Sequence, residues 1–275
     1  MTPKSILALV DGSQLSEATL DTAVMVAKNF AAALEVLHVR ADPATLVPIV
    51  GEGMSGAMVE QVMDAMSKSV DGRSQRARAV YDKAAAKAGI AITWRQETGP
   101  EPVVLASAGR LVDLTVLARP DAAADGQMAA SLDSALFDTG RPVLVAPAKS
   151  SGSVGKRIAV AWNGSAQASR VVSAAVAYLE KAEMVTVLTA PGFDKRAPAE
   201  ALVAYLAKHK VKATTQTVDP QGKHVGHALL EEATKQNCDL LVMGAYGHSR
   251  LREMILGGAT REVLAQSTIP VLMAH

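Results

Sequence analysis

Four glycines follow a short apolar run near the end of the chain. They stand at Gly244, Gly247, Gly257 and Gly258, in the pattern Gly-x2-Gly-x9-Gly-Gly. Glycine lets the backbone turn sharply at the end of a strand and approach a ligand closely. A glycine pair directly before a predicted helix also leaves free N–H groups at the positive end of that helix. Together these features predict a binding site for an anion such as a phosphate group.

Basic side chains accompany this glycine segment, which we define as residues 244–258. His248, Arg250 and Arg252 lie within it and Arg261 follows it. The pattern is not a Walker A loop, because no Gly-Lys-Ser/Thr occurs in it. A lone Gly-x2-Gly would favour simple turn or C-cap glycines. The second glycine pair, at the start of a predicted helix, favours the anion site instead.

The elements that position the glycine segment occur twice in the chain. Each half begins with an apolar run that ends in a Gly-Ser turn. An Ala-rich stretch with helical periodicity follows this run. The matching segments are residues 4–13 and 156–165, 34–39 and 184–189, 113–118 and 239–244, and 141–146 and 269–274. We therefore predict two duplicated domains, residues 1–149 and 156–275, joined by a short flexible linker.

Each half alternates short apolar runs with helical periodicity. This alternation predicts β-α-β units and an α/β fold, with two tandem open parallel sheets that carry helices on both faces. Ligand sites in such sheets lie at the carboxyl ends of the strands, where the glycine segment stands. The last strand of each half is a predicted edge, and unpaired edges tend to pair with one another. We expect residues 143–146 and 271–273 to pair, relating the halves by a pseudo-two-fold axis.

The duplicated chain resembles a tandem universal stress protein, with two such domains over nearly its whole length. The resemblance implies a Rossmann-like fold of the adenine nucleotide alpha hydrolase type. Nucleotide-binding members carry Gly-x2-Gly-x9-Gly-Ser/Thr, and their backbone amides hold the phosphates of ATP. Gly244, Gly247 and Gly257 match that motif. Gly258 departs from it, because the family pattern has a hydroxyl residue at that position.

The resemblance implies further contacts to the phosphates from side chains and amides near the glycines. His248 and Arg250 would add positive charge, and Ala259 and Thr260 would contribute from the start of the following helix. Thr260 would partly replace the hydroxyl that is missing at Gly258. The implied ligand is ATP, and any Mg²⁺ would arrive with the nucleotide and be held mainly by phosphates and water.

The loop after the first strand of the second half corresponds to the family's base and ribose pocket. Asn163 stands where the family often has Asp, and its amide can still donate or accept hydrogen bonds without a charge. Trp162, after Ala161, either covers the base or caps the sheet. Val187, at the end of the next strand, supplies an apolar wall of the pocket or belongs to the ordinary core.

The first half keeps the acidic turn Asp11-Gly12-Ser13 but lacks the glycine segment. Ala118 and Asp121 stand where the second half has its first two glycines. A carboxylate directed at phosphate would repel it. We therefore expect one nucleotide per chain, bound in the second half, with the first half a structural or partner-facing copy.

The implied function is that of an ATP-binding regulatory protein of the stress response. The alternative is a nucleotide-free scaffold or chaperone-like protein, because Gly258 lacks the hydroxyl and some family members lack ATP. An enzyme is not expected, beyond a very slow ATPase, because no carboxylate within residues 244–252 orients a water molecule. A hydrolase of the related nucleotide class is disfavoured because no substrate-activating site is found.

Composition excludes several other classes of protein. Hydrophobic residues make up 49% of the chain, which excludes global disorder. A net charge of +1 and an aromatic content of 3% argue against nucleic-acid binding. No apolar stretch is long enough for a membrane span, and no signal peptide is apparent, so we expect a cytoplasmic protein. The single cysteine, Cys238, excludes an internal disulfide.

Two further features have competing interpretations. Residues 41–80 hold Met54, Met58, Met63 and Met66, followed by a predicted helix that runs to about Lys87. These methionines either pack on their own sheet or contact a protein partner or second chain. His224, His227 and His248 lack a carboxylate ligand set nearby, so surface or capping roles are favoured over a metal site.

Overall fold

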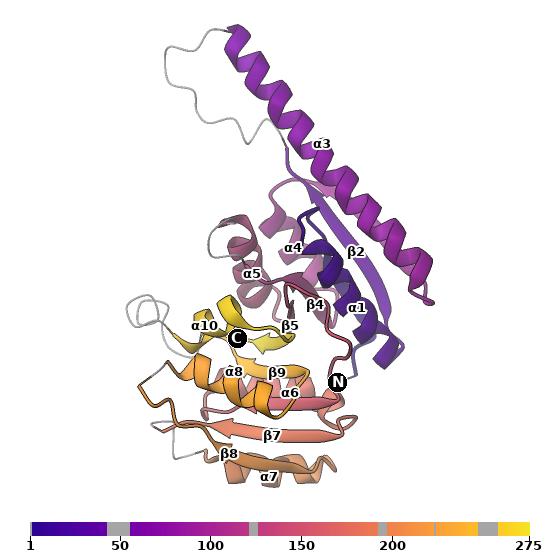
Figure 1. Cartoon of the computed structure of the whole chain (residues 1–275). Helices are drawn as coiled ribbons and strands as arrows, with labels where there is room; N and C mark the ends of the chain where they lie inside the picture. Colours follow the sequence, from indigo (N-terminus) through magenta and orange to yellow (C-terminus); the bar gives the residue numbers. More distant parts are fainter. Residues whose placement is uncertain (1, 43–55, 121–125, 192–196, 223, 247–257) are drawn as a thin grey trace.

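A sheet of ten strands runs through both halves of the chain (Figure 1). The computed structural model describes residues 2–42, 56–120, 126–191, 197–222, 224–246 and 258–275. The order of the strands is β3-β2-β1-β4-β5-β10-β9-β6-β7-β8. The two halves of this order are mirror copies, which confirms the predicted duplication and the α/β fold.

The elements of the two halves correspond closely. The strands are β1 (Ser5–Leu9), β2 (Ala33–Arg40), β3 (Ile92–Thr98), β4 (Leu114–Ala118), β5 (Val143–Ala146), β6 (Arg157–Ala161), β7 (Met184–Thr189), β8 (Ala213–Thr217), β9 (Leu240–Gly244) and β10 (Val271–Ala274). The helices are α1 (Ser16–Phe30), α3 (Gly56–Lys87), α4 (Glu101–Gly109), α5 (Gly126–Asp138), α6 (Ala166–Leu179), α7 (Ala199–Lys208), α8 (Val225–Lys235) and α10 (Ala259–Gln266). In the described ranges, no helix is long and apolar enough to cross a membrane.

The inner strands are buried on both faces. Ile6 and Ala8 of β1 belong to one core cluster, whereas Leu7 and Leu9 belong to the other. Successive residues of a strand point to opposite faces of the sheet, so helices on both sides are needed to cover them. Each cluster contains residues of both halves, and the core therefore continues across the whole sheet.

The two halves meet where β5 and β10 pair. The strands are antiparallel, with Leu144 opposite Leu272, Val145 opposite Val271, and Val143 opposite Met273. The other neighbouring strands of the sheet are parallel. Because Leu144 and Leu272 are equivalent positions of the duplicated sequence, the pairing is symmetric about them. The prediction that the last strands pair around a pseudo-two-fold axis is confirmed.

A short connection leads from β5 to β6 and is fixed partway along. Val154 is buried in the core cluster, and its carbonyl accepts a hydrogen bond from the Asn29 side chain at 3.1 Å. The predicted linker is therefore anchored to α1 of the first half before it enters the second half.

The main difference between the halves is the length of α3. This helix has 32 residues, whereas its counterpart α7 has 10. Figure 1 shows its N-terminal part extending well beyond the sheet. The predicted end at Lys87 is confirmed, and the helix includes Met58, which is 53% exposed, as well as the half-buried Met63 and Met66. Met54 lies outside the described residues.

Removing a side chain at the meeting point of the halves should destabilise the protein. We expect Leu144→Ala to lower the free energy of unfolding by about 2–5 kcal/mol, because it leaves a cavity in the core. Urea denaturation followed by circular dichroism measures this loss. The matched control is Leu111→Ala, at a residue 86% exposed, which should change the value by less than about 0.5 kcal/mol. An equal loss of free energy of unfolding in the two variants would contradict a stabilising role for the β5–β10 pair.

Candidate functional site

Equivalent turns follow the central strand of each half. Gly12 after β1 has φ +78° and Gly164 after β6 has φ +74°, a left-handed region that favours glycine. Asp11 and Asn163 each accept a hydrogen bond from the backbone N–H two residues ahead, at 3.0 and 3.1 Å. The amide of Asn163 thus reproduces the turn that the carboxylate of Asp11 makes. The second half has the uncharged Asn163 where the first half has the carboxylate of Asp11, yet the backbone of the turn is the same in both halves.

Gly244, at the end of β9, lies against the first turn of α6. A Cβ atom at this position would come within 2.6 Å of the Ala168 nitrogen and 2.8 Å of the Gln167 carbonyl carbon. Both distances are shorter than real Cβ contacts, so the close packing of strand and helix requires glycine here. The first glycine of the motif therefore has a structural role that is independent of any ligand.

The start of α10 presents open backbone donors. Gly258 is the N-cap residue, and no side chain caps the helix. Among the described residues, the N–H groups of Ala259 and Thr260 have no acceptor. A helix start of this kind carries a partial positive charge and binds anions. The phosphate contacts expected from Gly258, Ala259 and Thr260 stay a prediction.

The hydroxyl of Thr260 has a different role from the one expected. Thr260 is 3% exposed, and its Oγ1 accepts a hydrogen bond from the backbone N–H of Tyr246 at 3.3 Å. This bond ties the end of β9 to the start of α10. Because the hydroxyl is buried and engaged within the protein, it does not replace the hydroxyl that is missing at Gly258.

Glu262, in the first turn of α10, was missed by the sequence analysis. Its Oε2 accepts a hydrogen bond from the Gly226 N–H at 3.1 Å, and its Oε1 lies 3.1 Å from Nδ1 of His224. The carboxylate therefore accepts a hydrogen bond from the first turn of α8. His227 also has surface partners, Gln266 and Glu231. The side chains of His224 and His227 are 73% and 40% exposed, so both lie at the surface. Within the described residues, no group of side chains that could hold a metal ion occurs.

The side chains predicted to surround the base are mostly buried. Trp162 is 8% exposed, and its Nε1 donates a hydrogen bond to the Ala197 carbonyl at 2.7 Å. Val187 is fully buried and Ala161 is 9% exposed. Trp162 therefore caps the sheet, and Val187 belongs to the core and presents no surface to a ligand. Asn163 is half-buried and retains its Nδ2 donor without a partner among the described residues.

Part of the predicted site can thus be placed. The structure brings Asn163, Gly244 and residues 258–260 to the carboxyl ends of β6 and β9, which are neighbouring strands. Four predicted site residues lie outside the described residues: Gly247, His248, Arg250 and Gly257.

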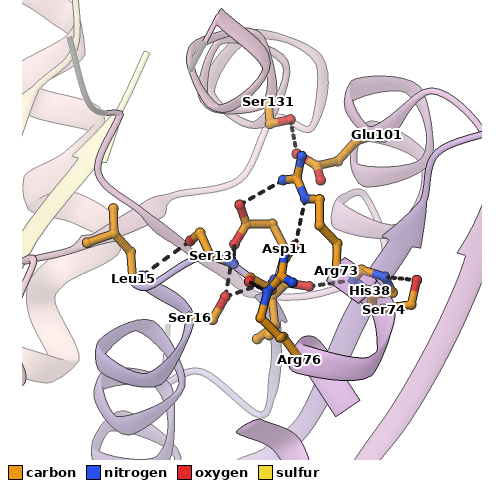
Figure 2. Close-up of polar contacts among 12 residues, drawn as sticks. Asp11, Ser13, Leu15, Ser16, His38, Arg73, Ser74, Arg76, Glu101 and Ser131 are labelled. Carbon is orange, nitrogen blue, oxygen red and sulfur yellow. Dashed lines mark hydrogen bonds and ion pairs between the residues drawn. The ribbon is translucent and has the colours of Figure 1, made fainter. Parts of the chain in front are cut away.

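The corresponding end of the first half is closed by its own helix. Asp11 is 4% exposed, and its Oδ2 lies 3.1 Å from the Arg73 guanidinium of α3, as Figure 2 shows. Burial alone would raise the pKa of Asp11, but hydrogen bonds from Ser13 and Ser16 and the Arg73 charge together hold it below its ordinary value. Asp11 is therefore a charged and satisfied part of the fold.

The backbone of α3 also lies directly on the Gly12 turn. A Cβ atom on Gly12 would come within 2.2 Å of the Arg73 carbonyl oxygen. Arg73 Nε donates to the Asp11 carbonyl at 3.2 Å, and Arg76 Nε donates to the Gly12 carbonyl at 3.0 Å. The helix thus covers the turn whose counterpart, in the second half, borders the candidate site.

A small cavity lies at this end of the first half. It has a volume of about 140 Å³ and is lined in part by His38, Arg73, Ser74 and Glu101. Both ring nitrogens of His38 have partners, the Val10 carbonyl at 2.8 Å and the Ser74 hydroxyl at 2.9 Å. Sites for drug-sized ligands usually measure roughly 300–1,000 Å³. The cavity is therefore too small for a nucleotide.

Removing the partner of Asp11 should destabilise the first half. We expect Arg73→Met to lower the free energy of unfolding by about 1–3 kcal/mol, because it leaves a buried carboxylate with fewer hydrogen bonds. Arg78→Met is the matched control, since the ion pair of Arg78 with Asp82 is exposed and contributes only about 0–1 kcal/mol. Chemical denaturation of both variants provides the comparison. Similar losses would contradict a structural role for the Asp11 pair.

Comparisons with known proteins agree with this architecture. A curated relative, universal stress protein Slr1230 from Synechocystis, is 27% identical over 98% of this chain and 99% of its own. A solved universal stress protein from Archaeoglobus fulgidus superposes with a TM-score of 0.67 at 18% identity, covering 100% of this chain and 96% of that one. A second, described as a putative universal stress protein of Pseudomonas aeruginosa, gives a TM-score of 0.56 at 15% identity, covering 99% and 93%. These two structures support the fold.

The sequence profile of the universal stress protein family matches the chain twice, over residues 2–135 and 155–275. The first match spans β1 to β4, and the second spans β6 to β10. The chain therefore belongs to the universal stress protein family, as a tandem member with two copies of its domain.

Proposed function

We propose that the second half binds an adenine nucleotide, ATP, as a regulatory ligand. The observation that carries the proposal is the open start of α10. Its first N–H groups, at Ala259 and Thr260, have no acceptor among the described residues, and Thr260 joins this helix start to the end of β9. These donors directly follow the glycine segment, which matches the nucleotide-binding pattern of the family at three of four positions.

The described residues suggest how the ligand would be held. The amides at the start of α10 would face the phosphates, where the positive end of the helix favours negative charge. The free Nδ2 of Asn163 would donate to the ribose or the base. Because no metal-ligand cluster occurs among the described residues, Mg²⁺ would be held by phosphates and water.

The same reasoning limits binding to one nucleotide per chain. In the first half, Arg73 and the backbone of α3 cover the Asp11-Gly12 turn, and the remaining cavity is about 140 Å³. The first half would therefore serve as a structural copy, and the cytoplasmic stress-response role expected from the sequence would depend on the second half.

One observation favours a different function, that of a nucleotide-free scaffold. Gly258 supplies no hydroxyl, and the hydroxyl of Thr260 is engaged by the Tyr246 N–H. Each lost hydrogen bond to a charged phosphate weakens binding, typically by about 1.5–3 kcal/mol. In a scaffold the open helix start would simply be hydrated.

Isothermal titration of the full chain with Mg²⁺ and ATP tests the proposal. We expect one site per chain, and loss of binding in Gly247→Val, because a side chain there would block close approach of the backbone. Asp121→Gly in the first half should leave the affinity unchanged. Cyclic AMP belongs in the titration as a second probe, since a universal stress protein has been solved in complex with cAMP. Absence of binding would favour the scaffold, and two equivalent sites would contradict the closed first half.

We further propose that bound ATP is not turned over at an ordinary enzymatic rate. Glu262 is held by the start of α8, so this carboxylate does not orient water for attack on a phosphate. Backbone amides that hold ground state and transition state equally do not raise the rate. We expect steady-state turnover far below the ~1–10³ s⁻¹ of ordinary enzymes. Turnover of about one per second or faster that disappears in Gly247→Val would overturn this expectation.

A further inference from the structure

The first half contributes an aromatic side chain to the end of β9 in the second half. Phe137, near the end of α5, has its ring centroid 5.6 Å from that of Tyr246 and 4.5 Å from that of His275. The His275 ring lies with Nδ1 3.1 Å from the Ala245 carbonyl. We call these three rings, Phe137, Tyr246 and His275, the aromatic bridge. It connects α5 to the beginning of the glycine segment.

Tyr246 has a backbone conformation that requires support. Its φ is +50°, in the left-handed region, which is unfavourable for a residue other than glycine. The structure supplies support from two sides. The Tyr246 N–H donates to Thr260 at the start of α10, and the Tyr246 ring packs against Phe137. The ring contact therefore helps to hold the N–H of Tyr246 on α10.

The first half also contacts the other end of α10. Arg119 is the residue directly after β4, and its Nη1 donates a hydrogen bond to the Ala265 carbonyl at 2.9 Å. Helix α10 is thus contacted at both ends. Arg119 of the first half binds its last turn, and the Tyr246 N–H binds its first turn. The Arg119 contact joins the two halves, whereas the Tyr246 bond lies within the second half.

The ring contact has no equivalent at the pseudo-symmetric position. Counting back from Pro142 and Pro270, Ala265 stands where α5 has Phe137. Counting on from the ends of β4 and β9, Pro120 stands where the glycine segment has Tyr246. The aromatic pair therefore supports only the half that keeps the glycine segment.

We propose that Phe137 is a positioning residue for the nucleotide site of the second half. Through Tyr246 it holds the end of β9 against the start of α10, so the first half completes a site to which it contributes no ligand contact. This inference rests on the proposed nucleotide binding. According to it, the affinity of the second half for ATP depends on Phe137, a side chain of the first half.

The test compares two variants that each shorten an aromatic side chain between the halves. Phe137→Leu removes the ring contact with Tyr246. Phe30→Leu is the matched control, because Phe30 packs against Tyr178 of the second half at 4.5 Å, in a contact with no part of the glycine segment. Titration with Mg²⁺ and ATP should show about tenfold weaker binding for Phe137→Leu, as expected for the loss of an aromatic pair. Phe30→Leu should bind as the wild type does.

A second measurement follows the proposed mechanism without nucleotide. Hydrogen exchange by NMR reports protection of the Tyr246 amide, with that of Val242 inside β9 as the internal reference. Exchange at Tyr246 should become faster in Phe137→Leu and stay unchanged in Phe30→Leu, while the Val242 amide stays protected in both. If Phe137→Leu fails to fold, Tyr246→Leu removes the same contact from the other side.

The outcomes separate this inference from the proposed function. If the wild type binds ATP and Phe137→Leu binds it equally well, the inference is wrong and the proposed function stands. Weaker binding with unchanged exchange at Tyr246 would also overturn the positioning role. If the wild-type chain binds no nucleotide, the proposed function fails and the inference fails with it.

Discussion

The antiparallel pairing of β5 and β10 is the interaction on which the rest of the structure depends. Each strand ends its own parallel sheet, and its outer N–H and C=O groups would otherwise need water or another chain. Pairing around Leu144 and Leu272 satisfies both edges at once. It also makes both core layers continuous and brings α5 of the first half against the end of β9. The first half therefore packs next to the candidate site of the second half.

The duplicated elements have diverged at the carboxyl ends of their strands. Both halves keep the same Gly-Ser turn geometry after their central strand, with Asp11 in one and Asn163 in the other. In the first half a long helix supplies Arg73, and its backbone packs on Gly12, so the turn is used for stability. In the second half the counterpart helix α7 has 10 residues, and Asn163 and Gly164 are half-buried. The greater length of α3 thus distinguishes the two ends.

Sequence reasoning predicted the features that depend on local pattern. The duplication, the parallel strands, the pairing of the last strands and the glycine at the end of β9 all leave periodic or positional signals. It could not predict partners that are distant in sequence, such as Arg73 for Asp11. The burial of Trp162 and Val187 and the bond between Thr260 and Tyr246 depend on how strands and helices pack, which no local pattern records. The absence of binding in the first half was predicted from Ala118 and Asp121, but its coverage by Arg73 and Arg76 of α3 was not.

The anchored connection between β5 and β6 has a consequence for how the protein responds to dilution. In a dimer of two separate domains, the meeting edge dissociates as the concentration falls. Here a short tether, fixed at Val154, keeps the two edges at an effective concentration in the millimolar range, as is typical for short linkers. Sites that need both halves therefore stay assembled even when a cell holds only a few copies of the chain.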